Sequence, residues 1–226
     1  EIESGDMKPF SQILQEANEE LGKLNLSYEQ LTVELKQAKE KAEKFARELK
    51  DVNVQLREMA FRDGLTGLYN HRYVQDVMDN DLSRSQRSKK AFSLMILDLD
   101  HFKKINDEYG HPVGDIVLKK VSKAIENTIR DSDFAARYGG EEFAVVLPET
   151  ELRGAAILAE RLRKAIDQLE IDTNGCRVDV TVSVGVKRYQ PSNYKIEKSE
   201  IFTQADNALY NSKNRGRNMI SIHNHG

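Results

Sequence analysis

A long heptad pattern near the N-terminus constrains the fold more than any other feature. From Phe10 to Met59, apolar residues recur at alternating steps of four and three, and no proline follows Pro9 in this stretch. This is the 3.5-residue period of a coiled-coil seam. A helix of about seven such heptads is roughly 75 Å long, too long to bury its apolar stripe on a small domain of its own chain. The seam residues are Leu14, Ala17, Leu21, Leu24, Tyr28, Leu31, Leu35, Ala38, Ala42, Phe45, Leu49, Val52, Leu56 and Met59.

We therefore predict a dimeric coiled-coil helix at residues 10–60, preceded by a linker or tail at residues 1–9. With Leu14 at position a, Glu34 falls at g and Lys39 at the following e, the offset that pairs across a parallel dimer. Two alternatives remain open, antiparallel pairing and packing of the helix on another partner. Three apolar residues fall at outer f positions and leave room for contact with a neighbouring domain: Leu26, Val33 and Val54.

A second region begins where the heptads end. The sequence AFRDGLTGLYN supplies turn residues, so residues 61–226 are predicted to form a separate domain. The order of its elements favours an α+β fold, a mostly antiparallel sheet covered by helices, over a regular α/β winding with a dinucleotide fingerprint. The predicted elements are a helix at 71–87, a strand at 92–100, helices at 101–110 and 112–130, a hairpin at 133–148, a helix at 153–169, a turn at Asn174-Gly175, a strand at 177–189, a helix at 199–214 and a strand at 218–223.

Composition excludes several classes of function. A net charge of −3 gives no electrostatic footprint for nonspecific nucleic-acid binding, so no nucleic-acid partner is expected. No stretch approaches the roughly 20 apolar residues of a membrane span. The single cysteine, Cys176, excludes an internal disulfide and fits a reducing compartment. We therefore expect a cytoplasmic protein with no membrane span in this chain.

The sequence RYGGEEF at residues 137–143 places two acids on a glycine turn. The hairpin is expected to lie beside the strand that ends at Asp98, so Glu141, Glu142 and Asp98 would crowd one edge of the sheet. Like charges repel unless a cation neutralises them, and carboxylates suit Mg²⁺ bound together with phosphates. Glycines at 139 and 140 would let a nucleotide approach the backbone. The alternative is a polar hairpin with solvated acids.

Two further polar segments could bind the rest of a nucleotide. Asn106 and Asp115 offer a donor and acceptors that match the edge of guanine, although both residue types are also common at helix ends. Lys213 and Arg217 are four apart, so both would face one phosphate tail if the last helix continues through Gly216. Otherwise this basic cluster is a solvated helix end.

Four ordered blocks together resemble the GGDEF domain of the diguanylate cyclase family, in its GGEEF variant. The resemblance implies a bacterial signalling enzyme that condenses two GTP molecules into cyclic di-GMP with release of pyrophosphate. It also implies a fold similar to the palm of nucleotidyl cyclases, so residues 61–226 would be the catalytic domain. The matching blocks are DGLTGL at 63–68 with Asn70, DLDHFKKINDEYGHPVGD at 98–115, GGEEF at 139–143, and Lys213 with Arg217.

The resemblance further implies roles for individual residues. Glu141, Glu142 and Asp98 would be catalytic, with Glu141 favoured as the proton acceptor. Two Mg²⁺ ions per GTP site, or Mn²⁺, would be held by these acids and the carbonyl of Leu99. An Arg-x-x-Asp motif five residues before the signature would bind the product as an inhibitor, through Arg130, Asp133 and Arg161. The implied substrate-binding residues are Phe102, Lys103, Asn106, His111, Asp115, Gly139, Gly140, Lys213 and Arg217.

The coiled coil has a place in this function, because a product made from two GTP molecules needs two substrate sites face to face. A parallel homodimer would supply them at high effective concentration, and its register would set activity. Two alternatives remain: a non-catalytic module that binds GTP or cyclic di-GMP, and a dimeric scaffold whose globular domain only docks partners. The intact set of acids favours the enzyme over the receptor.

Overall fold

The structure is a computed structural model that describes residues 9–173, 175–191 and 196–223. The chain divides into two units at the boundary between Arg57 and Glu58, and each is described by itself. Residues 1–8 of the predicted tail and Asn174 of the predicted turn lie outside the described residues.

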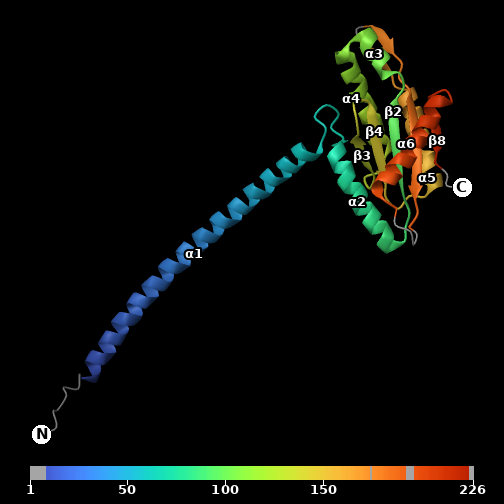
Figure 1. The fold of residues 1–226 in the computed structure, drawn as a ribbon. Helices are drawn as coiled ribbons and strands as arrows, with labels where there is room; N and C mark the ends of the chain where they lie inside the picture. The colour runs from blue at the N-terminus through green and yellow to red at the C-terminus, as the bar shows by residue number, and fades with distance from the viewer. Residues whose placement is uncertain (1–8, 174, 192–195, 224–226) are drawn as a thin grey trace. The chain divides into compact units, whose positions relative to one another are not determined.

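The N-terminal unit consists of one continuous helix, α1 (Phe10–Phe61), whose C-terminal residues extend into the second unit (Figure 1). The helix begins directly after Pro9, whose carbonyl accepts a hydrogen bond from the backbone N–H of Gln12 at 2.8 Å. The predicted long N-terminal helix is thus confirmed. Its seam is not buried by this chain, because Leu24 and Leu35 are 68% and 69% exposed. Among the described residues, no helix is apolar over a length that would cross a bilayer.

The second unit is built on a mixed, mostly antiparallel sheet, as predicted (Figure 1). Its strand order is β1-β3-β4-β2-β7-β8, in which the outer pairs β1·β3 and β7·β8 are parallel and the three central pairs are antiparallel. A two-stranded sheet, β5·β6, lies apart from it. The strands are β1 (Tyr69–Asn70), β2 (Phe92–Leu99), β3 (Phe134–Arg137), β4 (Glu142–Leu147), β5 (Ile171–Thr173), β6 (Cys176–Val178), β7 (Val182–Tyr189) and β8 (Ile220–Ile222).

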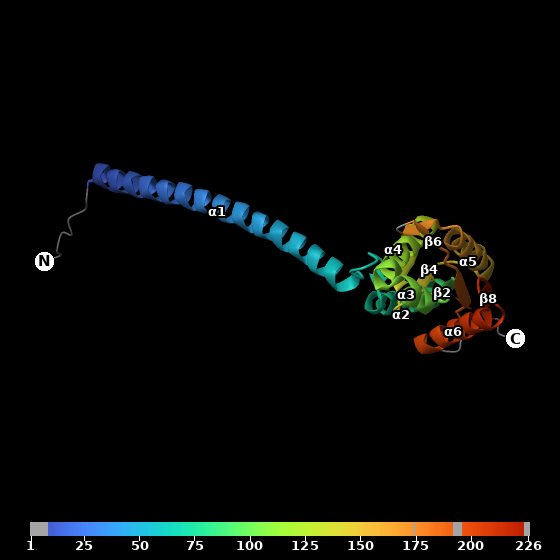
Figure 2. The same cartoon turned by 90° about the horizontal axis from the view of Figure 1, so that it is seen from above.

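Helices cover both faces of the central sheet. Every residue of β2 is buried, as its long apolar run predicts for a strand covered on two sides. Apolar residues of α4 and α5 share one core cluster with β2, and those of α2 and α6 share the other. Figure 2 shows α4 and α5 on one side of the sheet and α6 on the other. The helices are α2 (His71–Ser88), α3 (Phe102–Tyr109), α4 (His111–Thr128), α5 (Leu152–Asp167) and α6 (Lys198–Asn214).

One predicted element is wrong. Residues 177–189 were expected to form a single strand, but they form β6 and β7, which belong to different sheets. Val178, Val180 and Val182 are all buried, so the apolar alternation continues through the break. Periodicity reports which side chains are buried and not which strand they pair with, so it gives no signal for the change of sheet. The short strands β1 and β5 were not predicted.

Helix α6 lies so close to β7 that only glycine fits at position 185. A Cβ there would lie 2.2 Å from the carbonyl oxygen of Ala205 and 2.3 Å from the backbone nitrogen of Leu209. Because these are backbone atoms, the helix itself must move. We expect Gly185→Ala to lower the free energy of unfolding by about 3 kcal/mol, measured by urea denaturation. Gly64→Ala is the control, because a Cβ there meets nothing within 4 Å; equal effects of the two changes would contradict the prediction.

Candidate active site

The pairing of β2 with β4 brings the predicted acids together. Asp98 lies directly opposite Glu142 in the antiparallel register. The backbone N–H of Leu99 donates to the carbonyl of Glu141 at 3.3 Å. Asp98 is only 7% exposed, and both glutamates are partly buried. The hairpin that carries the two glutamates therefore lies beside the end of the buried strand, where the sequence placed it.

These acids lie in a region that disfavours their negative charge. Burial raises the pKa of Asp98, Glu141 and Glu142 above their usual ranges. The charge of Asp98 raises the pKa of both glutamates further, and the charge of Lys213 offsets part of this rise. Lys213 Nζ lies 2.7 Å from Asp98 Oδ2. More positive charge would stabilise the ionised acids.

The oxygen donors at this edge of the sheet suit a cation that binds together with a phosphate-bearing substrate. Within the part of the chain that the structure describes, no three acidic, histidine or cysteine side chains form a complete metal site. The available donors are carboxylates and backbone carbonyls, which are hard oxygen ligands. Mg²⁺ commonly takes only one or two carboxylates from a protein and completes its coordination with phosphates and water. The site is therefore chemically suited to a metal–nucleotide complex.

Arg137 holds the glycine turn in place. Its Nε and Nη2 atoms donate to the carbonyl of Gly140 at 3.1 and 2.8 Å, and its Nη1 lies 3.3 Å from Asp63 Oδ1. Burial tends to raise the pKa of Asp63, but hydrogen bonds from Thr66 and the charge of Arg137 outweigh it and lower that pKa. A Cβ on Gly139 would lie 2.6 Å from Glu142 Oε2, so this glycine makes room for the carboxylate. The sequence reasoning gave Arg137 no role, although it lies only two residues before the first glycine of the turn.

The predicted base-binding residues lie where α3 meets α4. Asn106 Oδ1 is buried and has no hydrogen-bond partner among the described residues. A buried acceptor without a partner is costly, and an N–H donor of a bound base would satisfy it. Asp115 is exposed near the start of α4, just after its first turn and next to Gly114. Lys103 and His111 are also exposed, whereas Phe102 is only 5% exposed, so its predicted contact with substrate stays a prediction.

Gly114 allows the close contact of α3 and α4 that positions Asn106. A Cβ at residue 114 would lie 1.9 Å from Asn106 Oδ1 and 3.1 Å from Phe102 Cζ. We expect Gly114→Ala to turn the amide away and, if GTP is the substrate as the resemblance implies, to raise KM for GTP about 10-fold or more, the cost of one lost buried hydrogen bond. Steady-state kinetics would measure this, with Gly64→Ala as the control. An unchanged KM would contradict the placement of Asn106 in the base site.

The predicted phosphate-binding cations meet the acids by an unexpected route. The last helix ends at Asn214, as predicted, so the condition that it continue through Gly216 is not met, and Gly216 has a φ of +121°. Arg217 lies instead in the following loop, with a φ of +65°. The charges of Lys213 and Arg217 both counteract the rise that burial causes in the pKa of Asp98. Packing of the loop, rather than helical spacing, brings the second cation to the acids.

The residues of the predicted product site also come together. Arg130, Asp133 and Arg161 line one hollow of ≈ 170 Å³ between the end of α4 and α5. The backbone N–H of Arg130 donates to Asp133 Oδ2 at 3.0 Å, so the motif also forms the turn before β3. A second hollow, of ≈ 260 Å³, shares Arg130 and Asp133 and is lined by Arg62 on its other side. Two arginines line each hollow.

Asp206 and Tyr138 also belong to this site, although the sequence reasoning gave neither a role. Burial raises the pKa of Glu142, and the charge of Asp206 on α6 contributes to the rise. Burial, Asp206 and Glu142 likewise raise the pKa of Tyr138. The ring of Tyr138 stacks on Phe202 of α6, with centroids 5.3 Å apart. The packing of α6 on the sheet brings Phe202 and Asp206 to the hairpin, in which Tyr138 directly precedes the glycine turn.

The fold and the site define an α+β domain whose acidic sheet edge is suited to binding a metal together with a nucleotide. The chain belongs to the family described as diguanylate cyclase, GGDEF domain, whose model matches residues 60–219. A curated relative, diguanylate cyclase A of Treponema denticola, is 41% identical over 174 residues. That match covers 75% of this chain and 46% of the relative, so the chain spans about half of the relative's length.

Two solved structures are similar over most of the chain. The diguanylate cyclase SiaD of Pseudomonas aeruginosa, in complex with its activator SiaC, has a TM-score of 0.78 and 32% identity, over 94% of this chain and 80% of that one. The coiled coil and GGDEF domain of DgcB from Caulobacter crescentus, in complex with c-di-GMP, has a TM-score of 0.74 and 32% identity. Here the match covers 84% of this chain and 98% of that one.

Proposed function

We propose that this chain is a diguanylate cyclase that joins two GTP molecules into cyclic di-GMP and releases pyrophosphate. One observation carries the proposal: the strand register sets Asp98 opposite Glu142 while Lys213 pairs with Asp98 from α6. This arrangement combines acids for a metal with cations for phosphates at one sheet edge. The names of its relatives support the same activity. We place the reaction in the cytoplasm, where GTP is available.

The acids form the reaction centre in this proposal. Asp98, the Leu99 carbonyl, Glu141 and Glu142 would hold two Mg²⁺ ions, and Mn²⁺ suits the same donors. When bound, the metal stabilises charge on the phosphates and lowers the pKa of the attacking 3′-hydroxyl. Glu141 is the proposed acceptor of the proton of that hydroxyl, because it is a carboxylate at the same edge of the sheet as Asp98 and Glu142.

Other residues bind and orient GTP. Asn106 and Asp115 recognise guanine, and the buried free acceptor of Asn106 supports this role. Lys213, which pairs with Asp98 at 2.7 Å, would bind the triphosphate once a metal held by Asp98 neutralised that carboxylate. The remaining residues proposed to contact substrate are Phe102, Lys103, His111, Gly139, Gly140 and Arg217.

The active form is proposed to be a homodimer joined by a parallel coiled coil of α1. Each domain binds one GTP, so two must face each other for the product to form. The exposed seam of α1 and the similarity to a structure of a coiled coil with a GGDEF domain support this assembly. A change in the register of the helix pair would then control activity.

Cyclic di-GMP is also proposed to inhibit the enzyme through Arg130, Asp133 and Arg161. The two arginines supply donors for the phosphates and purine edges of the product. The shared hollow at these residues supports the proposal, as does the presence of c-di-GMP in the similar DgcB structure.

The direct test is to incubate the purified chain with GTP and Mg²⁺ and to identify products by chromatography and mass. Any cyclic di-GMP that copurifies is removed first, and Asp98→Asn serves as the matched control. We expect cyclic di-GMP from the parent and none from the variant. GTP binding without turnover would overturn the proposal in favour of a receptor, and a folded dimer that binds no GTP would indicate a scaffold.

A further inference from the structure

We propose that Asp100, Asn218 and Arg163 form a positioning network that holds Arg217 where it meets the triphosphate of GTP. The inference rests on the proposed function, because it names how one substrate contact of that site is built. None of the three residues was selected as a substrate ligand. They are positioning residues, which act through Arg217.

The loop between α6 and β8 has a backbone conformation that needs external support. Gly216, Arg217 and Asn218 follow one another with φ values of +121°, +65° and +45°. L-residues other than glycine rarely adopt positive φ, and such positions persist only where surrounding contacts hold them. Two consecutive non-glycine residues of this kind therefore indicate a loop fixed by its neighbours.

Asp100 holds the backbone of this loop. Its carboxylate is only 5% exposed and lies two residues beyond Asp98. Asp100 Oδ2 accepts hydrogen bonds from the backbone N–H of Asn218 at 3.0 Å and from the Thr181 hydroxyl at 2.7 Å. Oδ1 accepts from the Ser183 hydroxyl at 2.7 Å. With donors on both of its oxygens, Asp100 ties the loop to the strand that carries the catalytic aspartate.

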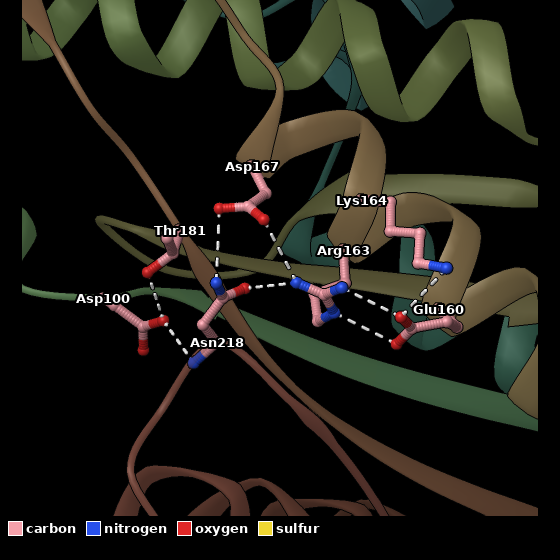
Figure 3. A network of polar contacts seen from close by, with 7 residues as sticks. All are labelled: Asp100, Glu160, Arg163, Lys164, Asp167, Thr181 and Asn218. Carbon is pink, nitrogen blue, oxygen red and sulfur yellow. Dashed lines mark hydrogen bonds and ion pairs between the residues drawn. The ribbon is translucent and has the colours of Figure 1, made fainter.

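Arg163 of α5 holds the side chain of the same loop residue. Arg163 Nη1 donates to Asn218 Oδ1 at 2.7 Å, and Asn218 Nδ2 donates to Asp167 Oδ1 at 3.2 Å. Arg163 is itself fixed by two hydrogen bonds to Glu160, at 2.9 and 3.0 Å. Figure 3 shows the continuous chain of contacts from Asp100 through Asn218 to Arg163 and Glu160. Asn218 is thus held at its backbone and at both amide atoms.

The contacts that fix Asn218 also restrain the preceding residue, Arg217. Its own backbone N–H donates to the carbonyl of Ser212 at 3.1 Å, which folds the loop back against the end of α6. The same helix end carries Lys213, whose Nζ lies 2.7 Å from Asp98 Oδ2. A guanidinium carried by a rigid loop loses less conformational freedom on binding phosphate than one on a mobile loop. Releasing Asn218 should therefore weaken GTP binding through Arg217.

The test is a double-mutant cycle between Asn218→Gly and Arg217→Ala, read as kcat and KM for GTP. Glycine tolerates positive φ and keeps the backbone N–H, so this change removes only the amide contacts. We expect Asn218→Gly to raise KM about 10-fold with a smaller change in kcat, and to have little further effect once Arg217 is alanine. Equal effects in both backgrounds would overturn the proposal, since a general loss of stability does not depend on Arg217.

Direct measurement of nucleotide binding distinguishes a failure of this inference from a failure of the proposed function. Asn218→Gly and Arg163→Ala should weaken GTP binding about 10-fold but leave GMP binding unchanged, because GMP lacks the outer phosphates. Lys164→Ala is the matched control, since Lys164 pairs with the same Glu160 at 3.7 Å and is 62% exposed. Equal losses for GTP and GMP, or no loss for either, would overturn the network. If the unsubstituted chain binds GTP without turning it over, the proposed cyclase activity is wrong, but the binding experiment still tests the network.

Discussion

Replacing Glu141 with glutamine is expected to reduce the production of cyclic di-GMP by about 10³-fold or more, because one change removes both a metal ligand and the proposed general base. Glutamine preserves the size of the side chain, and Glu141 is only partly buried, so the fold should remain. Turnover is measured at saturating GTP and Mg²⁺. Glu170→Gln, which changes an exposed glutamate elsewhere in the domain, is the control.

The same substitution has an expected effect on stability that separates catalysis from folding. Burial and the charge of Asp98 raise the pKa of Glu141 in the folded domain, so the folded state binds this proton more tightly than the unfolded chain. This group therefore destabilises the fold as pH rises through that raised pKa, and the penalty remains at neutral pH. Without metal, Glu141→Gln should have a Tm at pH 7 equal to or above that of the parent, with a smaller difference near pH 4. A Tm several degrees lower would mean that lost activity reports lost structure.

The second large effect is expected from charge in the α1 seam. Leu31→Lys combined with Leu35→Lys places four lysines in the core of a dimer, one d and one a layer. Such changes should separate the helices and lower the effective concentration of the two domains from millimolar values to that of the free protein. At nanomolar protein, we expect activity to fall about 100-fold or more and to recover as protein concentration increases.

The matched control changes two outer positions of the same helix, Leu26→Lys with Val33→Lys. It adds the same charge and the same residue type, but at f positions that face away from the seam. Sedimentation and activity are compared across protein concentrations. The coiled-coil assignment would be wrong if the f-position variant dissociated as readily as the seam variant, or if neither did. The first result would indicate that α1 packs on another partner through a different face.

Much of this fold could be predicted because its elements have strong local periods. The heptads of α1 and the apolar run of β2 each depend on neighbouring residues and appear directly in the sequence. The division between β6 and β7 does not appear in the sequence. Apolar and polar residues alternate across the break between the two strands, although β6 pairs with β5 and β7 pairs with β2. The pairing partner of a strand is a property of the sheet, which local periodicity does not record.

The sequence by itself determined the long helix, the acids on the hairpin and the basic residues near the C-terminus, because each is local in the chain. Only the tertiary structure decided how these groups meet. It placed Asp98 opposite Glu142, joined Arg137 to Asp63, and brought Lys213 to Asp98 from a helix more than a hundred residues away. It also decided that Arg217 lies beyond the end of α6, in a loop fixed by distant residues. Such contacts follow from how helices and strands pack in three dimensions, and no spacing along the chain encodes them.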